Sequence, residues 1–249
     1  MRIVRSGASV LIGRLHGLAN QSKARLGCGV YPIIRDLIQA CRHCCSAMTC
    51  TMHSCYACCM REAVIFDTEF TAWPGSAQRN WTAPGEFREI IQIGAIKVNC
   101  QTMTEVEAFS VLVKPTLNPM LSEYITGLTG ITQADIDVRG MNLTDAVRAF
   151  LAFCGGLPMF CYGYDGWIIA KNLALLGHSG FWTGVRPSNI GEWFQSAGVD
   201  VASINSSGLA AAVGASYDGR AHEAVGDCRS ILAAVRALIG RGVDSPFKD

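Results

Sequence analysis

Residues 63–70 (AVIFDTEF) constrain the fold of this chain more than any other segment. Their side chains alternate as a β-strand requires, and the apolar run 63–66 indicates a strand buried in a sheet. Asp67 and Glu69 are two residues apart and therefore point to the same face of that strand. Two carboxylates on one face at the end of an apolar strand repel each other, and they stay ionised only when a cation joins them. The alternative is a solvated edge strand that carries two surface acids.

The segments that follow predict an α/β fold. Two more strands come next, and helices then alternate with a further buried strand, which favours a mixed β-sheet with helices on both faces. The expected strands are residues 90–98, 108–113 and 158–164. The expected helices are residues 119–128, 142–153, 167–176, 189–197, 207–213 and 224–239.

Two further stretches place polar side chains where such sheets bind ligands. Asp165 follows an apolar stretch and precedes a helix, and open α/β sheets bind ligands at the carboxyl ends of their strands. Taken alone, Asp165 is better explained as a helix N-cap. His222 and Asp227 stand at the start of the last expected helix, with the small residues Ala224 and Gly226 between them, so that a metal or phosphate could approach. A lone histidine before a helix is more often a surface residue, but here it is placed to act as a general base beside a metal ligand.

The order of these residues resembles the signature of the DEDDh 3′→5′ exonucleases, and the resemblance covers about residues 61–240. Residues 89–94 (EIIQIG) are similar to the family's second strand, and residues 128–132 (LTGIT) are similar to its loop over the terminal nucleotide. With residues 66–71 (FDTEFT), they look nearest to the Eri-1/KapD-like branch, which is associated mainly with RNA trimming. All five signature positions are filled, so nothing in the sequence suggests an inactive enzyme.

The resemblance implies a ribonuclease H-like fold and a two-metal mechanism. Asp67, Glu69, Asp165 and Asp227 would hold two Mg²⁺ or Mn²⁺ ions, and His222 would take a proton from the attacking water. The product would be a nucleoside 5′-monophosphate. Plain core packing explains Phe70 almost as well as a contact to the last nucleotide does. The residues expected to contact that nucleotide are Glu69, Phe70, Leu128, Ile131 and His222.

Composition separates an N-terminal extension, residues 1–59, from the expected exonuclease domain, residues 60–249. Residues 1–60 carry seven Lys or Arg and one acid, whereas residues 61–249 carry 14 basic and 19 acidic side chains. Eight of the twelve cysteines also lie before residue 60. Paired Cys-x-x-Cys motifs at 41–44 and 55–58 are compatible with zinc. However, extra cysteines and histidines crowd them and no strand pattern surrounds them, so zinc is not expected there.

Two explanations of the extension remain. It resembles a basic organellar leader, since acids are nearly absent. The favoured explanation is a mis-assigned start or a poorly ordered segment, because Met60 directly precedes the first core strand. We therefore expect a chain that starts at Met60 to fold and cleave as well as the full chain does.

The whole chain is predicted to be a metal-dependent 3′→5′ exonuclease that acts on single-stranded or 3′-overhanging RNA or DNA ends, with RNA favoured. The net charge of +1 gives no global signature of nucleic-acid binding. No apolar run of 18 residues exists, so no membrane contact is expected. The scattered later cysteines suit a reducing compartment, and a cytoplasmic location is expected. A homodimer is left open. The alternatives are a DNA proofreading-type exonuclease, a non-nuclease metal hydrolase and a non-catalytic nucleic-acid-binding module.

Overall fold

A computed structural model describes residues 62–247 of the chain. The predictions on residues 1–59 lie outside these residues. The described part contains a five-stranded sheet in the order β3-β2-β1-β4-β5. β1 pairs antiparallel with β2 and parallel with β4, so the sheet is mixed and β1 lies at its centre. The strands are β1 (Glu62–Phe70), β2 (Ile90–Asn99), β3 (Thr104–Leu112), β4 (Met159–Cys161) and β5 (Ser188–Asn189).

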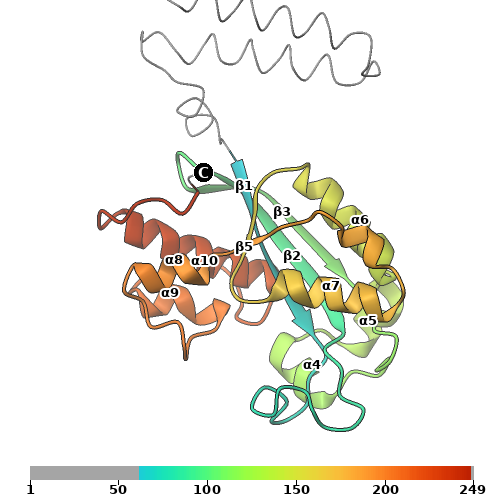
Figure 1. The fold of residues 1–249 in the computed structure, drawn as a ribbon. Coiled ribbons are helices and arrows are strands. Elements are labelled where there is room, and N and C mark those ends of the chain that lie inside the picture. The colour runs from blue at the N-terminus through green and yellow to red at the C-terminus, as the bar shows by residue number, and fades with distance from the viewer. Residues whose placement is uncertain (1–61, 248–249) are drawn as a thin grey trace, which may run out of the picture. The chain divides into compact units, whose positions relative to one another are not determined.

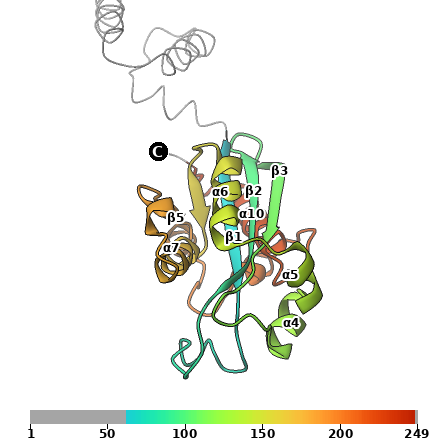
Figure 2. The ribbon, with the colours of Figure 1, turned by 90° about the vertical axis from the view of Figure 1, so that its right-hand side faces the viewer.

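Helices cover both faces of this sheet (Figures 1 and 2). Val64 and Phe66 of β1 pack in a core with residues of α6 and α7, and Ile65 packs on the other face with residues of α10. The predicted mixed α/β sheet flanked by helices is therefore confirmed. The helices are α4 (Glu123–Thr129), α5 (Gln133–Arg139), α6 (Leu143–Cys154), α7 (Asp165–Leu175), α8 (Gly191–Ser196), α9 (Leu209–Ala212) and α10 (Ala224–Ile239). Two 3₁₀ turns, η1 (Ser179–Trp182) and η2 (Ser206–Gly208), complete the described elements.

Several boundaries differ from the sequence-based prediction for local reasons. The helix expected at 119–128 begins only at Glu123, because the Ser122 hydroxyl caps it by accepting from the Ile125 amide. The strand expected at 158–164 keeps only the three residues of β4. The helices expected at 189–197 and 207–213 are shorter, and Ser188–Asn189 forms β5 beside β4. Helix α5 was not predicted, since only one of its residues is buried.

Close contact between β2 and α10 sets the position of the last helix. A Cβ atom at Gly94 would lie 2.6 Å from both the Cβ of Ala224 and the amide nitrogen of Val225. The Gln92 side-chain oxygen also accepts a hydrogen bond from the Ala224 amide at 3.2 Å. The absence of a side chain at Gly94 therefore lets the first turn of α10 lie directly on the central strands. No helix in residues 62–247 is long and apolar enough to cross a membrane.

We expect Gly94→Ala to destabilise the fold by about 1–3 kcal/mol, because the new methyl group overpacks a backbone contact. Urea unfolding followed by circular dichroism measures this change. Gly127→Ala is the matched control: Gly127 lies in α4 with no neighbouring atom within 4 Å of an added Cβ. Alanine there should leave the free energy of unfolding unchanged or raise it by up to about 1 kcal/mol. Equal effects of the two substitutions would contradict the packing argument.

Candidate active site

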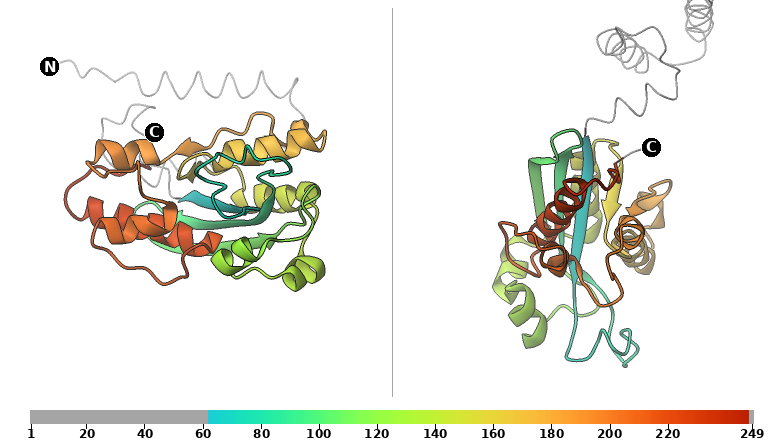
Figure 3. Two further views of the ribbon diagram at one scale, coloured as in Figure 1. Left: turned by 90° about the horizontal axis from the view of Figure 1, so that it is seen from below. Right: turned by 90° about the vertical axis from the view of Figure 1, so that its left-hand side faces the viewer.

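The carboxyl end of β1 carries two buried carboxylates. Asp67 is 5% and Glu69 is 8% exposed. Strand alternation puts both on the face of Ala63 and Ile65, which pack against α10. Figure 3 (left) looks at this end of the molecule from below, where the teal connection between β1 and β2 lies between the green α4–α5 segment and the yellow helices. The alternative of a solvated edge strand is wrong, because β1 is central and buried.

Asp165, at the start of α7, is hydrogen-bonded to β1. It is the first residue of α7, and the N-cap position belongs to Tyr164, which makes no capping bond. The Asp165 carboxylate instead accepts hydrogen bonds from the Thr68 amide at 3.1 Å and from the Thr68 hydroxyl at 2.5 Å. The interpretation of Asp165 as a helix cap is therefore wrong, and its side chain points to the strand that carries Asp67 and Glu69.

Asp227 reaches the same place from the first turn of α10. It is 2% exposed, and its carboxylate accepts from the Ser206 hydroxyl at 3.0 Å and from the His222 amide at 3.2 Å. Glu223 caps the helix by accepting from the Gly226 amide at 2.9 Å. The loop that contains His222 is thus tied to the helix that carries Asp227.

His222 lies beside these carboxylates in a constrained loop. One ligand atom each of Glu69, His222 and Asp227 lies within 4.8 Å of the other two. His222 has a φ angle of 59°, a left-handed conformation that is uncommon for residues other than glycine. A Cβ at Gly226 would lie 2.2 Å from the Arg220 carbonyl oxygen. The small residue at 226 therefore makes room for the chain's own backbone, and not for a metal or phosphate as the sequence suggested.

Burial and mutual repulsion dominate the electrostatics of the site. Burial, and then Asp165, Glu69 and Asp227 in that order, raise the pKa of Asp67 well above its usual range. Burial, with Asp227 and Asp165, raises the pKa of Glu69 to about 8. Burial raises the pKa values of Asp165 and Asp227 to about 6.

Among the described residues, no lysine or arginine lowers the pKa of any of these four carboxylates. Such a cluster of oxygen donors without a basic partner fits divalent cations, which would replace repulsion by attraction.

These pKa shifts predict how metal ions change stability with pH. In the metal-free protein the four carboxylates hold protons that the unfolded chain has lost, so stability falls as pH rises from about 4, the unfolded pKa of Asp and Glu, towards 8. Metal binding competes with those protons. We therefore expect Mg²⁺ or Mn²⁺ to raise Tm more at pH 8 than at pH 5, in melts compared with chelator at each pH. A metal-induced shift that is equal at both pH values, or larger at pH 5, would contradict the cluster.

The other residues predicted to contact the last nucleotide are buried or partly buried in the fold. Phe70 is partly buried and meets Trp81 edge-on with ring centroids 5.3 Å apart. Ile131 is 7% exposed and packs in a core cluster with Ile91 and Ile125. Leu128 is half-buried, and its carbonyl oxygen accepts from Arg220 at 3.4 Å. Packing therefore accounts for most of the surface of Phe70 and Ile131, and neither residue touches the carboxylates in any hydrogen bond or ring contact.

Sequence reasoning missed the residues that hold the site together. Thr68 stands between the two strand carboxylates, and only its contact with Asp165 reveals its role. Ser206 lies 21 residues before Asp227 in an irregular stretch, where no pattern marks it. Tyr164, next to Asp165, is 73% exposed, whereas the sequence placed it in the buried strand expected at 158–164, so its exposure could not be predicted.

Comparison with known proteins shows similarity to exonucleases. The family model described as Exonuclease matches residues 64–160, which include Asp67 and Glu69. The 3'-5' exoribonuclease 1 of Mus musculus is 29% identical over 191 residues, covering 70% of this chain and 52% of the mouse protein. The 3'-5' exonuclease Snipper of Drosophila melanogaster is 26% identical over 215 residues, covering 72% of this chain and 69% of the fly protein. The chain thus spans about half the length of the mouse relative.

A solved structure has a similar fold. The nuclease domain of 3'hExo, described as a DEDDh family member bound to rAMP, superposes with a TM-score of 0.61 at 20% identity. The match covers 77% of this chain and 98% of that domain. The chain is similar in sequence to exonucleases, and it shares the fold of a DEDDh nuclease domain. The four carboxylates that the sequence resemblance implied lie on β1, α7 and α10, in that order along the chain.

Proposed function

We propose that this chain is a metal-dependent 3′→5′ exonuclease of the DEDDh type that releases nucleoside 5′-monophosphates from single-stranded or 3′-overhanging nucleic acid, with RNA favoured. The observation that carries the proposal is the convergence of four buried carboxylates whose charge no lysine or arginine within residues 62–247 balances. A histidine whose ring lies within reach of two of them supplies a proton acceptor.

Each residue of the site has a role in hydrolysis. Asp67, Glu69, Asp165 and Asp227 would hold two divalent cations, which when bound supply the charge that stabilises the attacking and leaving oxygens. His222 accepts a proton from the attacking water at a ring nitrogen. Burial, and then Arg220, lower its pKa, so the ring is neutral and ready to accept at neutral pH. The bond from water oxygen to phosphorus forms as the bond from phosphorus to the 3′-oxygen breaks.

RNA as the favoured substrate rests on the relatives. The mouse relative is named an exoribonuclease, and the related nuclease domain is bound to rAMP. Exposed Tyr164 beside Asp165 offers a ring on which any base can stack, so little sequence preference is expected. Magnesium and manganese are the proposed ions because an all-carboxylate set suits hard cations.

Matched single-stranded RNA and DNA oligomers of one sequence test the substrate. With Mg²⁺ or Mn²⁺ we expect a ladder of shortened 5′-labelled products, with RNA degraded faster, and no products with chelator. Faster degradation of DNA would favour the proofreading-type alternative. Binding without any degradation in either metal would favour a non-catalytic module.

A further inference from the structure

An arginine in the connection between β1 and β2 is stacked on aromatic rings close to the site. The Arg88 guanidinium carbon lies 3.9 Å from the ring centroid of Trp81 and 5.9 Å from that of Phe70. The Trp81 indole donates to the Thr71 carbonyl oxygen at 2.9 Å, and Arg88 donates to the Asn80 side chain. The Trp81 ring and the guanidinium are therefore held in fixed orientations beside Phe70, the residue that follows Glu69.

The charge of Arg88 has no counter-charge in the described part of the chain. Arg79, in the same connection, forms an ion pair with Glu86, whereas Arg88 forms none with any residue in 62–247. Burial lowers the pKa of Arg88, and no carboxylate opposes that effect. A guanidinium has five N–H donors, and the bond to Asn80 is its one side-chain hydrogen bond among these residues. Free donors on a fixed cation suit an anionic group such as a phosphate.

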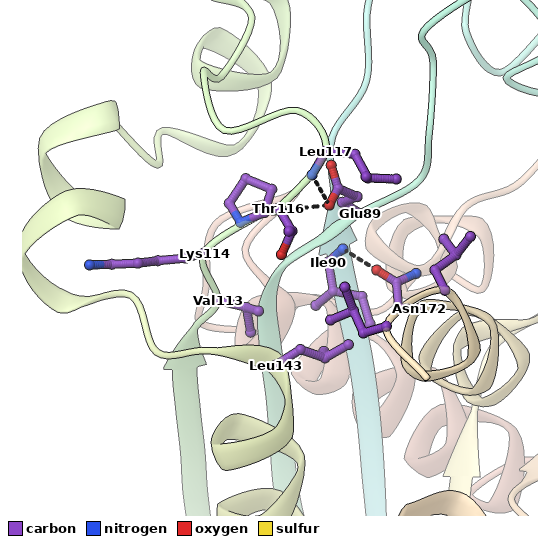
Figure 4. Close-up of a pocket in the computed structure, with 11 residues that line it drawn as sticks. Glu89, Ile90, Val113, Lys114, Thr116, Leu117, Leu143 and Asn172 are labelled. Carbon is purple, nitrogen blue, oxygen red and sulfur yellow. Dashed lines mark hydrogen bonds between the residues drawn. The ribbon is translucent and has the colours of Figure 1, made fainter. Parts of the chain in front are cut away.

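Helix α7 continues this surface. Asn172 donates to the Arg88 carbonyl oxygen at 2.7 Å and accepts from the Ile90 amide at 3.0 Å, and Figure 4 shows the second bond. On the exposed side of the helix, the Lys171 ammonium lies 5.2 Å from the ring centroid of Trp167, which is 54% exposed. The only acid in α7 is Asp165, which is buried in the site. The outward side of α7 is therefore aromatic and basic.

We propose that these two cation–aromatic pairs form an upstream platform, made of Trp81, Arg88, Trp167 and Lys171, that binds the single strand preceding the 3′-terminal nucleotide. The proposal rests on the exonuclease function proposed above. Continuity with the site supports it, because Trp167 follows Asp165 by two residues and the Trp81–Arg88 pair packs on Phe70, next to Glu69. Arg88 and Lys171 contact phosphates, and Trp167 stacks on a base, which makes binding independent of sequence.

Two substrates separate the platform from the catalytic site. The p-nitrophenyl ester of thymidine 5′-monophosphate has no upstream nucleotide, whereas a ten-nucleotide single-stranded RNA reaches past the site. We expect Trp167→Ala to raise KM for the RNA by about 5- to 100-fold, the range for loss of one base–aromatic stack, and to leave hydrolysis of the ester unchanged. An equal effect on ester and RNA, or no effect on either, would overturn the role of Trp167.

The salt dependence of RNA binding tests whether Arg88 and Lys171 contact phosphates, and it needs no catalytic turnover. In an Asp67→Asn background, fluorescence anisotropy gives Kd for labelled RNA across a range of KCl concentrations. Each of Arg88→Gln and Lys171→Gln should reduce the slope of log Kd against log salt by about 0.7, the value for one phosphate contact on a single strand. Arg88→Lys keeps the charge and should keep the slope. A wild-type slope in both glutamine variants would overturn the platform.

A matched control removes a similar charge elsewhere. Arg148, on α6, also lies over an aromatic ring, 5.4 Å from the centroid of Phe181. Arg148→Gln should leave both the slope of log Kd against log salt and the KM for the RNA unchanged. If it lowered the slope as much as the platform variants do, the effect would be one of net charge, and the proposal would be overturned. If wild type cleaves neither ester nor RNA, the exonuclease proposal fails, whereas the slopes still decide the platform. Thermal melts of each variant confirm that the fold is intact.

Discussion

Asp67→Asn is expected to lower turnover by more than about 100-fold, since removal of a group that merely supports metal ligands already costs up to that factor. The substitution removes one of the four carboxylates that would hold the cations, and it changes the shape of the side chain little. The metal-free fold should not lose stability. Burial and three neighbouring carboxylates raise the pKa of Asp67, so a neutral amide relieves repulsion there. Turnover under saturating metal and Tm in chelator measure the two effects.

Asp137→Asn is the control for Asp67→Asn. Asp137 is an exposed carboxylate of α5, and its contact is with the Gln133 side chain on the same helix. Its loss should change neither turnover nor metal binding. If Asp67→Asn kept more than a few per cent of activity with an unchanged Tm, the assignment of the site would be wrong.

His222→Ala is expected to slow the chemical step by about 10²–10⁴-fold, as loss of a general base does, while Mn²⁺ binding is kept. Single-turnover rates and calorimetric titration of Mn²⁺ separate the two roles. The geometry makes this separation necessary, because a His222 ring nitrogen lies within 4.8 Å of carboxylate oxygens of both Glu69 and Asp227. Loss of Mn²⁺ affinity in the variant would make His222 a metal ligand instead.

Two further measurements test the base role of His222: a control substitution and the pH dependence of the wild-type rate. His178 is exposed, and its ring meets Phe181 edge-on, so His178→Ala should leave the rate unchanged. Burial and Arg220 lower the pKa of His222, so the wild-type rate should rise with pH through a titration that lies below about 6.5, the ordinary histidine value. A flat profile from pH 5 to 8 would count against the base role.

Strong apolar periodicity explains which parts of the fold were predictable. β1, β2 and α10 carry long runs of buried residues, and their observed bounds lie within one residue of those expected. β5 has two residues and α5 buries only Ile136, so neither leaves a pattern in the sequence. These short elements exist because of contacts with distant segments, such as the pairing of β5 with β4.

In the candidate site too, the residues placed by local periodicity were predictable, and those placed by contacts with distant segments were not. Asp67 and Glu69 could be placed on one face because strand alternation is local. The role of Asp165 could not be settled locally, since an aspartate before a helix is most often a cap, and here a threonine 97 residues earlier redirects it. The small size of Gly226 was visible in the sequence, but the atom that occupies the space beside it is the carbonyl oxygen of Arg220. The position of that atom depends on a loop in which His222 has a positive φ angle, which no sequence pattern marks.

Release of the terminal nucleotide tests the central claim most directly. A single-stranded RNA with a radioactive phosphate in its last internucleotide linkage is incubated with the full chain, and the products are separated by thin-layer chromatography. The account predicts that the first labelled product is a nucleoside 5′-monophosphate, formed with Mg²⁺ or Mn²⁺ and absent with chelator or with Asp67→Asn. A labelled 3′-phosphate, a first cut within the chain, or release that persists in chelator would contradict it.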